Sequence, residues 1–225
     1  MSFAPSVGLQ DMRLTLTTFV TLDGVMQAPG GQGEDPSGGF DQEGWLVPYA
    51  DADMGRAMVG FFEEADAFLL GRRTYEIFAA WWPKATDTSD PVASALNGLP
   101  KHVASRTLRD VAWEGSTLIE GDVVDYVAEL KRRPGRELQV HGSGNLAGTL
   151  MQHGLIDEYR LLTYPVVLGK GRRLFTEGTR PAALRLVDTR TTASGVTISV
   201  YEPAGEPTYG TFAAPDTAEI TSPSD

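Results

Sequence analysis

The segment ELQVHGSGNL, residues 137–146, passes from a short apolar strand through a glycine-rich turn into a helical pattern. Gly142 and Gly144 have no Cβ atom and tolerate positive φ angles, so a ligand can approach the backbone closely. The helix that follows offers free N–H groups and the positive end of its dipole, which favour a phosphate. Ser143 and Asn145 add side-chain donors. The segment predicts either a phosphate-binding turn or a simple tight connection between strand and helix.

A second segment, LLGRRTYE at residues 69–76, has the same order of elements. An apolar strand ends at Gly71, and Arg72, Arg73 and Thr74 follow as donors in the first turn of a predicted helix. In open α/β sheets, ligands collect at the carboxyl ends of the strands. We therefore expect this junction and the glycine turn to border one crevice.

The segment VASRT at residues 103–107 supplies a third junction, in which Ser105 and Arg106 follow a short strand. A planar guanidinium fork suits a 2′-phosphate, and a neighbouring hydroxyl adds a donor. Three junctions along one crevice fit a dinucleotide, and the arginine favours NADPH over NADH. The spacing nevertheless excludes an ordinary Rossmann domain, because the next glycine is Gly148 and the motif comes late in the chain.

Composition narrows the class of protein. The chain has 225 residues, of which 41% are hydrophobic and 22% charged, as in an ordinary globular domain. It contains no cysteine and three scattered histidines, so we expect no metal site. The formal net charge of −11 argues against a nucleic-acid partner. No apolar run approaches the roughly 18 residues of a membrane span, and the N-terminus resembles no signal peptide, so we expect a cytoplasmic protein without a membrane partner.

The hydrophobic pattern predicts an α/β domain over residues 13–202, with tails at 1–12 and 203–225. Strands alternate with helices until a terminal hairpin forms around Ser194 and Gly195. The strands are predicted at 13–24, 66–71, 101–106, 116–121, 137–142 and 157–169, and the helices at 50–65, 72–82, 122–133 and 144–154. The glycine-rich stretch 26–44 is predicted to be an active-site lid or a flexible insertion.

In this order, the segments LDG, LLGRRTYE, VASRT, VHGSGNL and LTYPVVLGKGRRLF resemble the dihydrofolate reductase-like superfamily. More narrowly, the chain is similar to the C-terminal reductase domain of the bacterial riboflavin-biosynthesis enzyme RibD, over about residues 13–202. The resemblance implies a three-layer fold with a mixed, mostly parallel sheet of about eight strands, helices on both faces and a C-terminal antiparallel hairpin. It also implies NADPH bound across the carboxyl edge.

The resemblance assigns cofactor roles to three groups of residues. Gly71, Arg72, Arg73 and Thr74 would border the adenosine, with Ser105 and Arg106 at the 2′-phosphate. Gly142, Ser143, Gly144, Asn145 and Leu146 would hold the pyrophosphate. The segment from Thr21 to Gly24 would lie beside the nicotinamide.

The candidates for the reaction itself are less constrained by sequence. Asp23, Asp51 and Asp53 are candidate proton donors or substrate anchors, with an Asp-Gly turn or a helix N-cap as the structural alternatives. Trp45, Tyr49, Trp81 and Trp82 are candidates for an aromatic wall against a flat substrate, or for the core.

Three functions remain open from sequence. The first is an NADPH-dependent reductase of a small heterocyclic or carbonyl substrate, resembling 5-amino-6-(5-phosphoribosylamino)uracil reductase or dihydrofolate reductase. The second is an NADP-binding module without catalysis. The third is a non-redox protein that binds a nucleotide or sugar phosphate. A homodimer is also expected, since TYPVVLG is apolar on both faces, although a buried parallel strand explains the same run.

Overall fold

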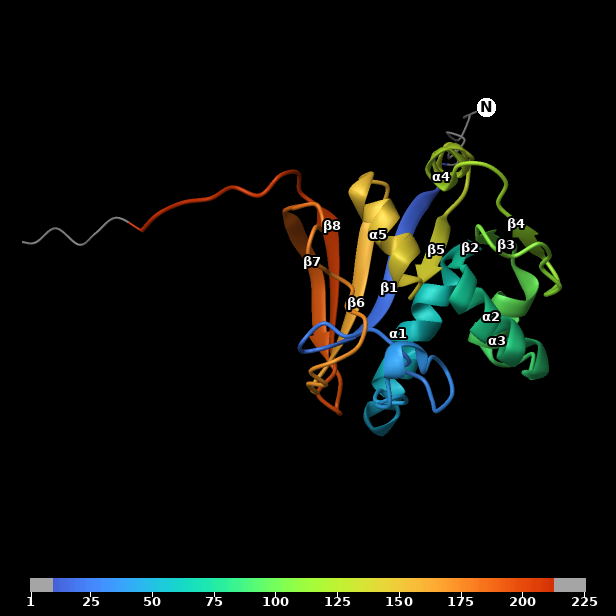
Figure 1. The fold of residues 1–225 in the computed structure, drawn as a ribbon, viewed down its shortest axis with the longest axis horizontal. Coiled ribbons are helices and arrows are strands. Elements are labelled where there is room, and N and C mark those ends of the chain that lie inside the picture. Colours follow the sequence, from blue (N-terminus) through green and yellow to red (C-terminus); the bar gives the residue numbers. More distant parts are fainter. Residues whose placement is uncertain (1–9, 213–225) are drawn as a thin grey trace, which may run out of the picture.

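The computed structural model describes residues 10–212, which form one eight-stranded sheet flanked by helices (Figure 1). The strand order is β4-β3-β2-β5-β1-β6-β8-β7. The strands are β1 (Arg13–Thr21), β2 (Ala65–Gly71), β3 (Lys101–Ala104), β4 (Ser116–Leu118), β5 (Glu137–His141), β6 (Glu158–Tyr164), β7 (Leu184–Thr191) and β8 (Thr197–Pro203).

Six neighbouring strands, from β4 to β6 in the sheet order, pair in parallel. Strand β8 pairs antiparallel with β6 and with β7. The predicted hairpin forms, with Gly195 at a φ angle of 86° in its turn. The expected mixed, mostly parallel sheet with a C-terminal antiparallel pair is therefore confirmed.

Helices cover both faces of the sheet, which gives three layers. Residues Leu14 and Leu16 of β1 pack against α4 (Val123–Lys131) and α5 (Gly144–Gln152) on one face. The opposite face packs against α1 (Ala52–Glu63), α2 (Arg72–Trp81) and α3 (Pro91–Gly98). Short 3-10 turns lie at Ser37–Gly39, Val47–Tyr49 and Trp82–Lys84. Because side chains alternate along β1, its odd-numbered threonines face the α1 layer.

Two elements differ from the sequence-based expectation. Strand β6 ends at Tyr164 rather than Gly169, because Pro165 has no N–H to continue the ladder. Helix α3 was not predicted, although Asp90 caps it and Pro91 begins it. The Lys101 ammonium, buried beneath α3, donates to the carbonyls of Leu96 and Leu99 at 2.7 and 2.8 Å, and so has a structural role.

Within residues 10–212, none of the helices has the length and apolarity that a bilayer crossing requires. The same residues bring together no group of three His, Asp or Glu side chains suited to a metal ion.

Candidate active-site cleft

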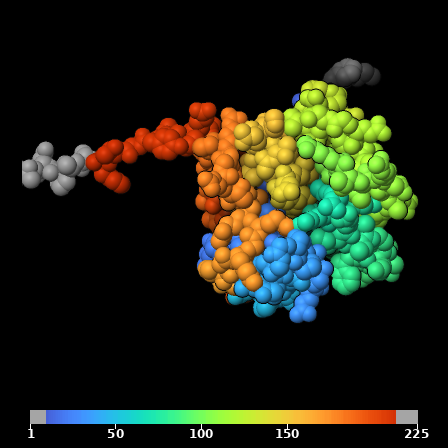
Figure 2. All heavy atoms as spheres, viewed as in Figure 1, coloured from blue at the N-terminus to red at the C-terminus, as the bar shows by residue number. Residues whose placement is uncertain are grey.

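A cleft of about 1760 Å³ crosses the carboxyl ends of β1, β2, β3 and β5. Its walls come from the glycine-rich loop 26–44, the start of α2, the start of α5 and the segment after β6. On the face shown in Figure 2, these loops and helices surround a hollow. The three junctions expected to share a crevice therefore do line a single cleft.

The glycine turn is joined directly to the junction after β2. Ser143 accepts a hydrogen bond from the Gly71 N–H at its Oγ (3.0 Å) and donates from that Oγ to the His141 carbonyl (3.1 Å). The Ser143 N–H donates to Thr74 Oγ1 at 3.2 Å. Ser143 has a positive φ angle of 53°, uncommon outside glycine. The Ser143 hydroxyl joins the two junctions. It is therefore already bonded within the protein, which corrects the prediction that it is a free donor for a phosphate.

The first turn of α5 leaves backbone donors open to the cleft. The first amide of the turn with a helical partner is that of Ala147, which donates to the Ser143 carbonyl at 2.9 Å. Among the described residues, the N–H groups of Gly144, Asn145 and Leu146 have no partner, and no side chain caps them. A Cβ on Gly144 would lie 3.0 Å from Met26 Sδ, so any other residue there requires the Met26 side chain to shift. Three converging amides at a helix N-terminus fit a pyrophosphate.

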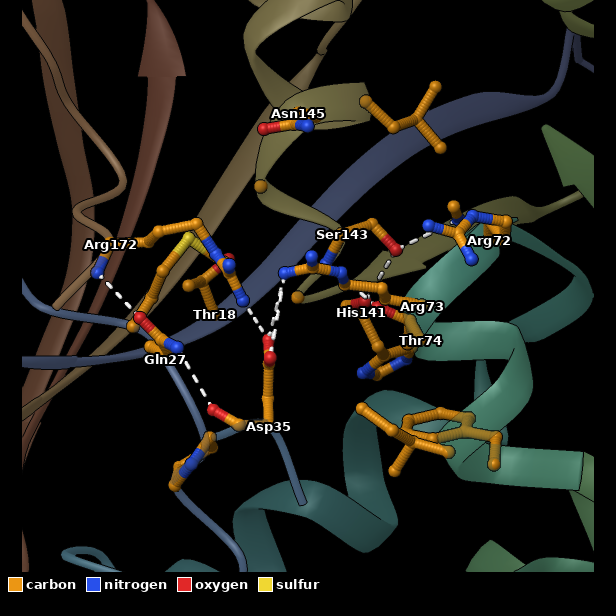
Figure 3. A pocket seen from close by; sticks show the side chains of 18 of the residues that line it. Thr18, Gln27, Asp35, Arg72, Arg73, Thr74, His141, Ser143, Asn145 and Arg172 are labelled. Atoms are coloured by element: carbon orange, nitrogen blue, oxygen red, sulfur yellow. Dashed lines mark hydrogen bonds and ion pairs between the residues drawn. The ribbon is translucent and has the colours of Figure 1, made fainter. Parts of the chain in front are cut away.

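A carboxylate of the glycine-rich loop bridges two walls of the cleft (Figure 3). Asp35 pairs with Arg73 at 3.4 Å and also with Arg172. Both guanidinium groups donate to Ser37 Oγ, at 2.7 and 2.8 Å. Gln27 holds the loop by donating to the carbonyls of Asp35 and Ser37 at 2.9 Å. The loop is therefore an ordered wall of the cleft, which argues against a flexible insertion.

The other two predicted phosphate groups line the same cleft. Ser105 Oγ accepts from the N–H groups of Thr107 and Leu108, at 3.1 and 2.9 Å, and so shapes the turn. Arg106 is exposed beside it. Arg72 lines the cleft as well and pairs with Glu76 at 3.2 Å. The cofactor roles of these residues remain predictions.

The turn at Thr21, Asp23 and Gly24 does not line the cleft, contrary to the expectation that it borders the nicotinamide. Asp23 accepts from Thr21 Oγ1 at 2.6 Å and from the N–H of Gly169 at 2.9 Å, and pairs with Arg173. The Thr21 hydrogen bond above all lowers the pKa of Asp23 to about 2. Asp23 thus anchors the loop after β6, and an ionised carboxylate of this kind is unsuited to donate a proton.

Asp51 and Asp53 also lie outside the cleft lining. Asp51 caps α1 by accepting from the Met54 N–H at 2.8 Å, and this bond is the main cause of its lowered pKa. Asp53 pairs with Arg56 and accepts from the Ala193 N–H at 3.2 Å. The helix-cap alternative is correct for Asp51, and Asp53 does not face a substrate pocket.

Trp45 and Tyr49 belong to a core cluster rather than to a substrate wall. The Trp45 indole N–H donates to the Gln27 carbonyl at 2.7 Å. Both rings pack edge-on against Tyr164, with centroid distances of 5.3 and 6.1 Å. Neither residue lines the cleft, whereas Trp81 and Trp82 of the same predicted wall do. Aromatic residues beside Gly-rich loops are indistinguishable by sequence from core residues, because both environments favour them.

Three residues of α1 that lie one turn apart line the cleft: Met54, Met58 and Phe62. We call this part the α1 side of the cleft. His141, at the end of β5, lies there with its ring stacked on Phe62 at a centroid distance of 4.6 Å. Burial, reinforced by Arg160, lowers the pKa of His141 to about 3. The α1 side of the cleft is thus apolar, with a neutral imidazole in it.

Sequence reasoning missed His141, Gln27, Asp35 and Arg172. The available sequence signal for His141 was the alternation of the polar residues Glu137, Gln139 and His141 along a buried strand. Gln27 and Asp35 lie in the loop predicted to be an active-site lid or a flexible insertion, and Arg172 lies in a basic cluster at 170–173. Their partners are distant in sequence, so only the fold shows which of these side chains meet.

Comparisons with known proteins give the same family as the motifs. The model of the RibD C-terminal domain matches residues 13–198. The uncharacterized protein YyaP of Bacillus subtilis (strain 168) is 31% identical over 195 residues, covering 86% of this chain and 96% of YyaP. A second protein of that organism, YwjB, is 29% identical over 181 residues, covering 80% of this chain and 92% of YwjB.

Solved structures share the fold at lower identity. A putative riboflavin biosynthesis protein from Shewanella sp. PV-4 has a TM-score of 0.64 and 22% identity, covering 85% of this chain and 99% of that one. Dihydrofolate reductase from Enterococcus faecalis, complexed with NADP(H), has a TM-score of 0.55 and 14% identity, covering 87% and 98%. The fold is thus that of RibD and dihydrofolate reductase, and the chain belongs to the RibD C-terminal domain family.

Proposed function

We propose that this protein is an NADPH-dependent reductase of a small heterocyclic or carbonyl substrate. The observation that carries the proposal is the joined pair of junctions, in which Ser143 bonds Gly71, just before α2, and Thr74, in the first turn of α2. This arrangement places a helix N-terminus with open amides beside an arginine-bearing helix start, along one cleft. Family membership and the NADP(H) named with the dihydrofolate reductase neighbour support the same cofactor.

The described residues fit NADPH in three parts. The amides of Gly144, Asn145 and Leu146 would hold the pyrophosphate, where helix dipole and N–H groups favour negative charge. Gly71 and the start of α2 would border the adenosine side. Arg106, exposed beside Ser105, would meet the 2′-phosphate that distinguishes NADPH from NADH.

When bound, NADPH supplies the hydride. The protein's own contribution is to hold the substrate on the α1 side of the cleft, where Met54, Met58 and Phe62 exclude water. Since Asp23, Asp51 and Asp53 all lie outside the lining, we propose that the proton comes from solvent water rather than from a carboxylate of α1.

A fluorescence titration with NADPH and with NADH tests the proposal. We expect binding of NADPH in the micromolar range and weaker binding of NADH. Arg106→Gln should reduce this preference by roughly tenfold, because it removes a charge-assisted contact. Arg109→Gln is the matched control, since Arg109 is exposed nearby but does not line the cleft. Absence of NADPH binding to the wild-type protein would exclude the proposed function.

Two other functions are separated by further measurements. The position of all three candidate carboxylates outside the lining favours, as a second candidate, an NADP-binding module without catalysis. Steady oxidation of NADPH with a pterin, a pyrimidine or a quinone would remove that candidate. Mass spectrometry of a copurifying nucleotide or sugar phosphate would instead support a non-redox binding protein.

We also propose that the protein is a cytoplasmic homodimer. The edge strand β7 exposes Leu186 and Val187, each by nearly half, and this pair supports a protein contact along the sheet edge. Light scattering of the wild-type protein and of a Leu186→Lys variant measures the oligomeric state. A monomeric wild-type protein would contradict this proposal.

A further inference from the structure

A line of buried, hydrogen-bonded side chains lies on one face of the sheet and ends at His141. Glu137, Gln139 and His141 occupy alternate positions of β5 and so share one face of the sheet. Arg160 of β6 holds both oxygens of Glu137, at 2.9 and 2.5 Å. Gln139 Nε2 donates to Glu137 Oε2 at 2.7 Å, and Gln139 Oε1 lies 3.0 Å from His141 Nε2. All four side chains are buried.

This line fixes the orientation of the Gln139 amide. Its Nε2 faces two groups that only accept, the Glu137 carboxylate and the Phe61 carbonyl at 2.5 Å. The amide oxygen must then face His141. Because that oxygen only accepts, the hydrogen of the neutral imidazole is on Nε2, and Nδ1 carries the lone pair.

The lone pair of Nδ1 has no hydrogen-bond partner among the described residues. The ring lies among the side chains that line the cleft (Figure 3), and its burial together with the positive charge of Arg160 keeps it unprotonated. Phe62 covers one face of the ring. No free carboxylate of β5 or α1 faces the imidazole, since Glu137 is paired with Arg160 and no carboxylate of α1 lines the cleft.

A second polar group on the same sheet face also lacks a partner. Thr17 of β1 is the Cα partner of His141 in the parallel ladder, and it lines the cleft. Its hydroxyl is buried, and no group of the described residues bonds to it. The Thr15 hydroxyl, on the same sheet face but outside the cleft lining, is also buried without a partner among the described residues. A buried polar atom left unpaired is costly and calls for an explanation, of which a bound molecule is one.

We propose that His141 is the specificity-determining residue of the α1 side of the cleft, and that its Nδ1 accepts a hydrogen bond from a ring N–H of an uncharged, planar heterocycle. The methionine and phenylalanine walls accommodate a flat ring without charge, and a fixed acceptor selects a substrate that has a donor at that position. Glu137, Gln139 and Arg160 are positioning residues, since they act only through the orientation of the imidazole. The proposal rests on the proposed function of the cleft as a substrate site.

The test uses uracil, isocytosine and pterin as probes, each compared with its N-methylated counterpart in calorimetric titrations without NADPH. At least one N–H probe should bind the wild-type protein about tenfold more tightly than its N-methylated form, because the methyl group removes the donor. His141→Gln replaces Nε2–H but offers no acceptor at the Nδ1 position, so it should abolish this difference. His141→Asn keeps an oxygen at the Nδ1 position and should retain the difference. This cycle isolates the coupling between the probe N–H and His141.

Two outcomes overturn the proposal. One is that no N–H probe binds the wild-type protein, and the other is that methylation weakens binding equally in the wild-type and His141→Gln proteins. If these variants fail to fold, ¹⁵N spectra of the wild-type imidazoles decide instead. Three histidines make assignment tractable, and His141 should show Nε2–H, an unprotonated Nδ1 and a shift at Nδ1 when the probe is added. A proton on Nδ1 at neutral pH would also overturn it.

The wild-type protein is titrated separately with NADPH. Failure of NADPH to bind excludes the proposed reductase function but leaves the coupling between His141 and the probe measurable. Binding of NADPH without that coupling excludes the role of His141 alone. The reductase function and the role of His141 are therefore tested by different measurements.

Discussion

Asp35 Oδ2 lies 3.4 Å from Arg73 Nη1, so a carboxylate of the glycine-rich loop neutralises an arginine at the start of α2. The same carboxylate pairs with Arg172 beyond β6. Both arginines line the cleft, and each is nearly half exposed. An anionic cofactor entering here meets guanidinium groups that already have a negative partner.

Replacing Asp35 by Asn should therefore tighten NADPH binding. Removing the carboxylate frees two guanidinium groups, and a gain of about 1 kcal/mol, or roughly fivefold in Kd, is expected for partly exposed charges. The effect should shrink at high ionic strength because salt screens such pairs. Asp41→Asn is the control. Asp41 lies on the same glycine-rich loop as Asp35 and pairs with Lys170, but it does not line the cleft. Weaker NADPH binding in Asp35→Asn would show instead that the pairs of Asp35 with Arg73 and Arg172 are needed to hold the loop in place for binding.

Replacing Ser143 by Ala should lower the free energy of unfolding by about 1 to 3 kcal/mol, because the Gly71 N–H loses its acceptor in a partly buried site. NADPH binding should weaken as well, since the two junctions are no longer joined. Urea denaturation and a cofactor titration measure the two effects. Ser89→Ala is the control, because that hydroxyl bonds only Asp87 in an exposed turn. Equal losses in both variants would argue against a special role for Ser143.

Replacing Glu137 by Leu should cost about 3 kcal/mol, at the lower end for a broken buried pair, because Arg160 loses its bidentate partner and keeps only Glu158, at 2.6 Å. The double variant Glu137→Leu, Arg160→Leu should recover part of that loss, since the buried arginine is removed and Glu158 keeps its pair with Arg13. Chemical denaturation measures both. Arg132→Ala removes an exposed pair with Glu129 and should change stability by at most about 1 kcal/mol. A double variant as unstable as the single one would contradict the charge argument.

Acidification from pH 7 to pH 5 should destabilise the wild-type protein partly through His141. The folded-state pKa is about 3, below the ordinary value of 6.5, so between these values the unfolded chain binds the proton more readily. Stability from this group is complete above about pH 6.5 and is lost as the pH falls toward 3. His141→Gln should remove about 2 kcal/mol of the difference between pH 7 and pH 5. If urea denaturation gives the same stability difference between pH 7 and pH 5 in the wild-type and His141→Gln proteins, then His141 of the folded protein takes up its proton within this pH range.

Local sequence was sufficient for the fold and for the three junctions that line the cleft. The glycine turn at 142–144, the donors after Gly71 and the Ser105-Arg106 turn are each encoded by adjacent residues, because strand ends and helix starts have local patterns. The boundary at Pro165 and the cap at Asp90 have local causes as well, although they were overlooked.

The position of the catalytic and substrate candidates outside the cleft lining could not be read from local sequence, for a different reason. Besides local partners, Asp23, Asp51 and Asp53 bond residues at 168–169 and 193–194, which are far away in the sequence. Trp45 and Tyr49 pack on Tyr164, more than a hundred residues further along the chain. A residue type shows what a side chain is able to do, whereas its partners decide whether it faces ligand or core.

The sequence by itself determined the order of strands and helices apart from α3, the three junctions and the family to which their order belongs. The tertiary structure alone decided that Ser143 joins two junctions, that Asp35 bridges the cleft, and that Met54, Met58, Phe62 and His141 line its α1 side. The physical reason is that propensity, capping and turn geometry act over a few residues. Ion pairing, burial and the resulting pKa shifts depend on strands and loops that meet only when the sheet assembles.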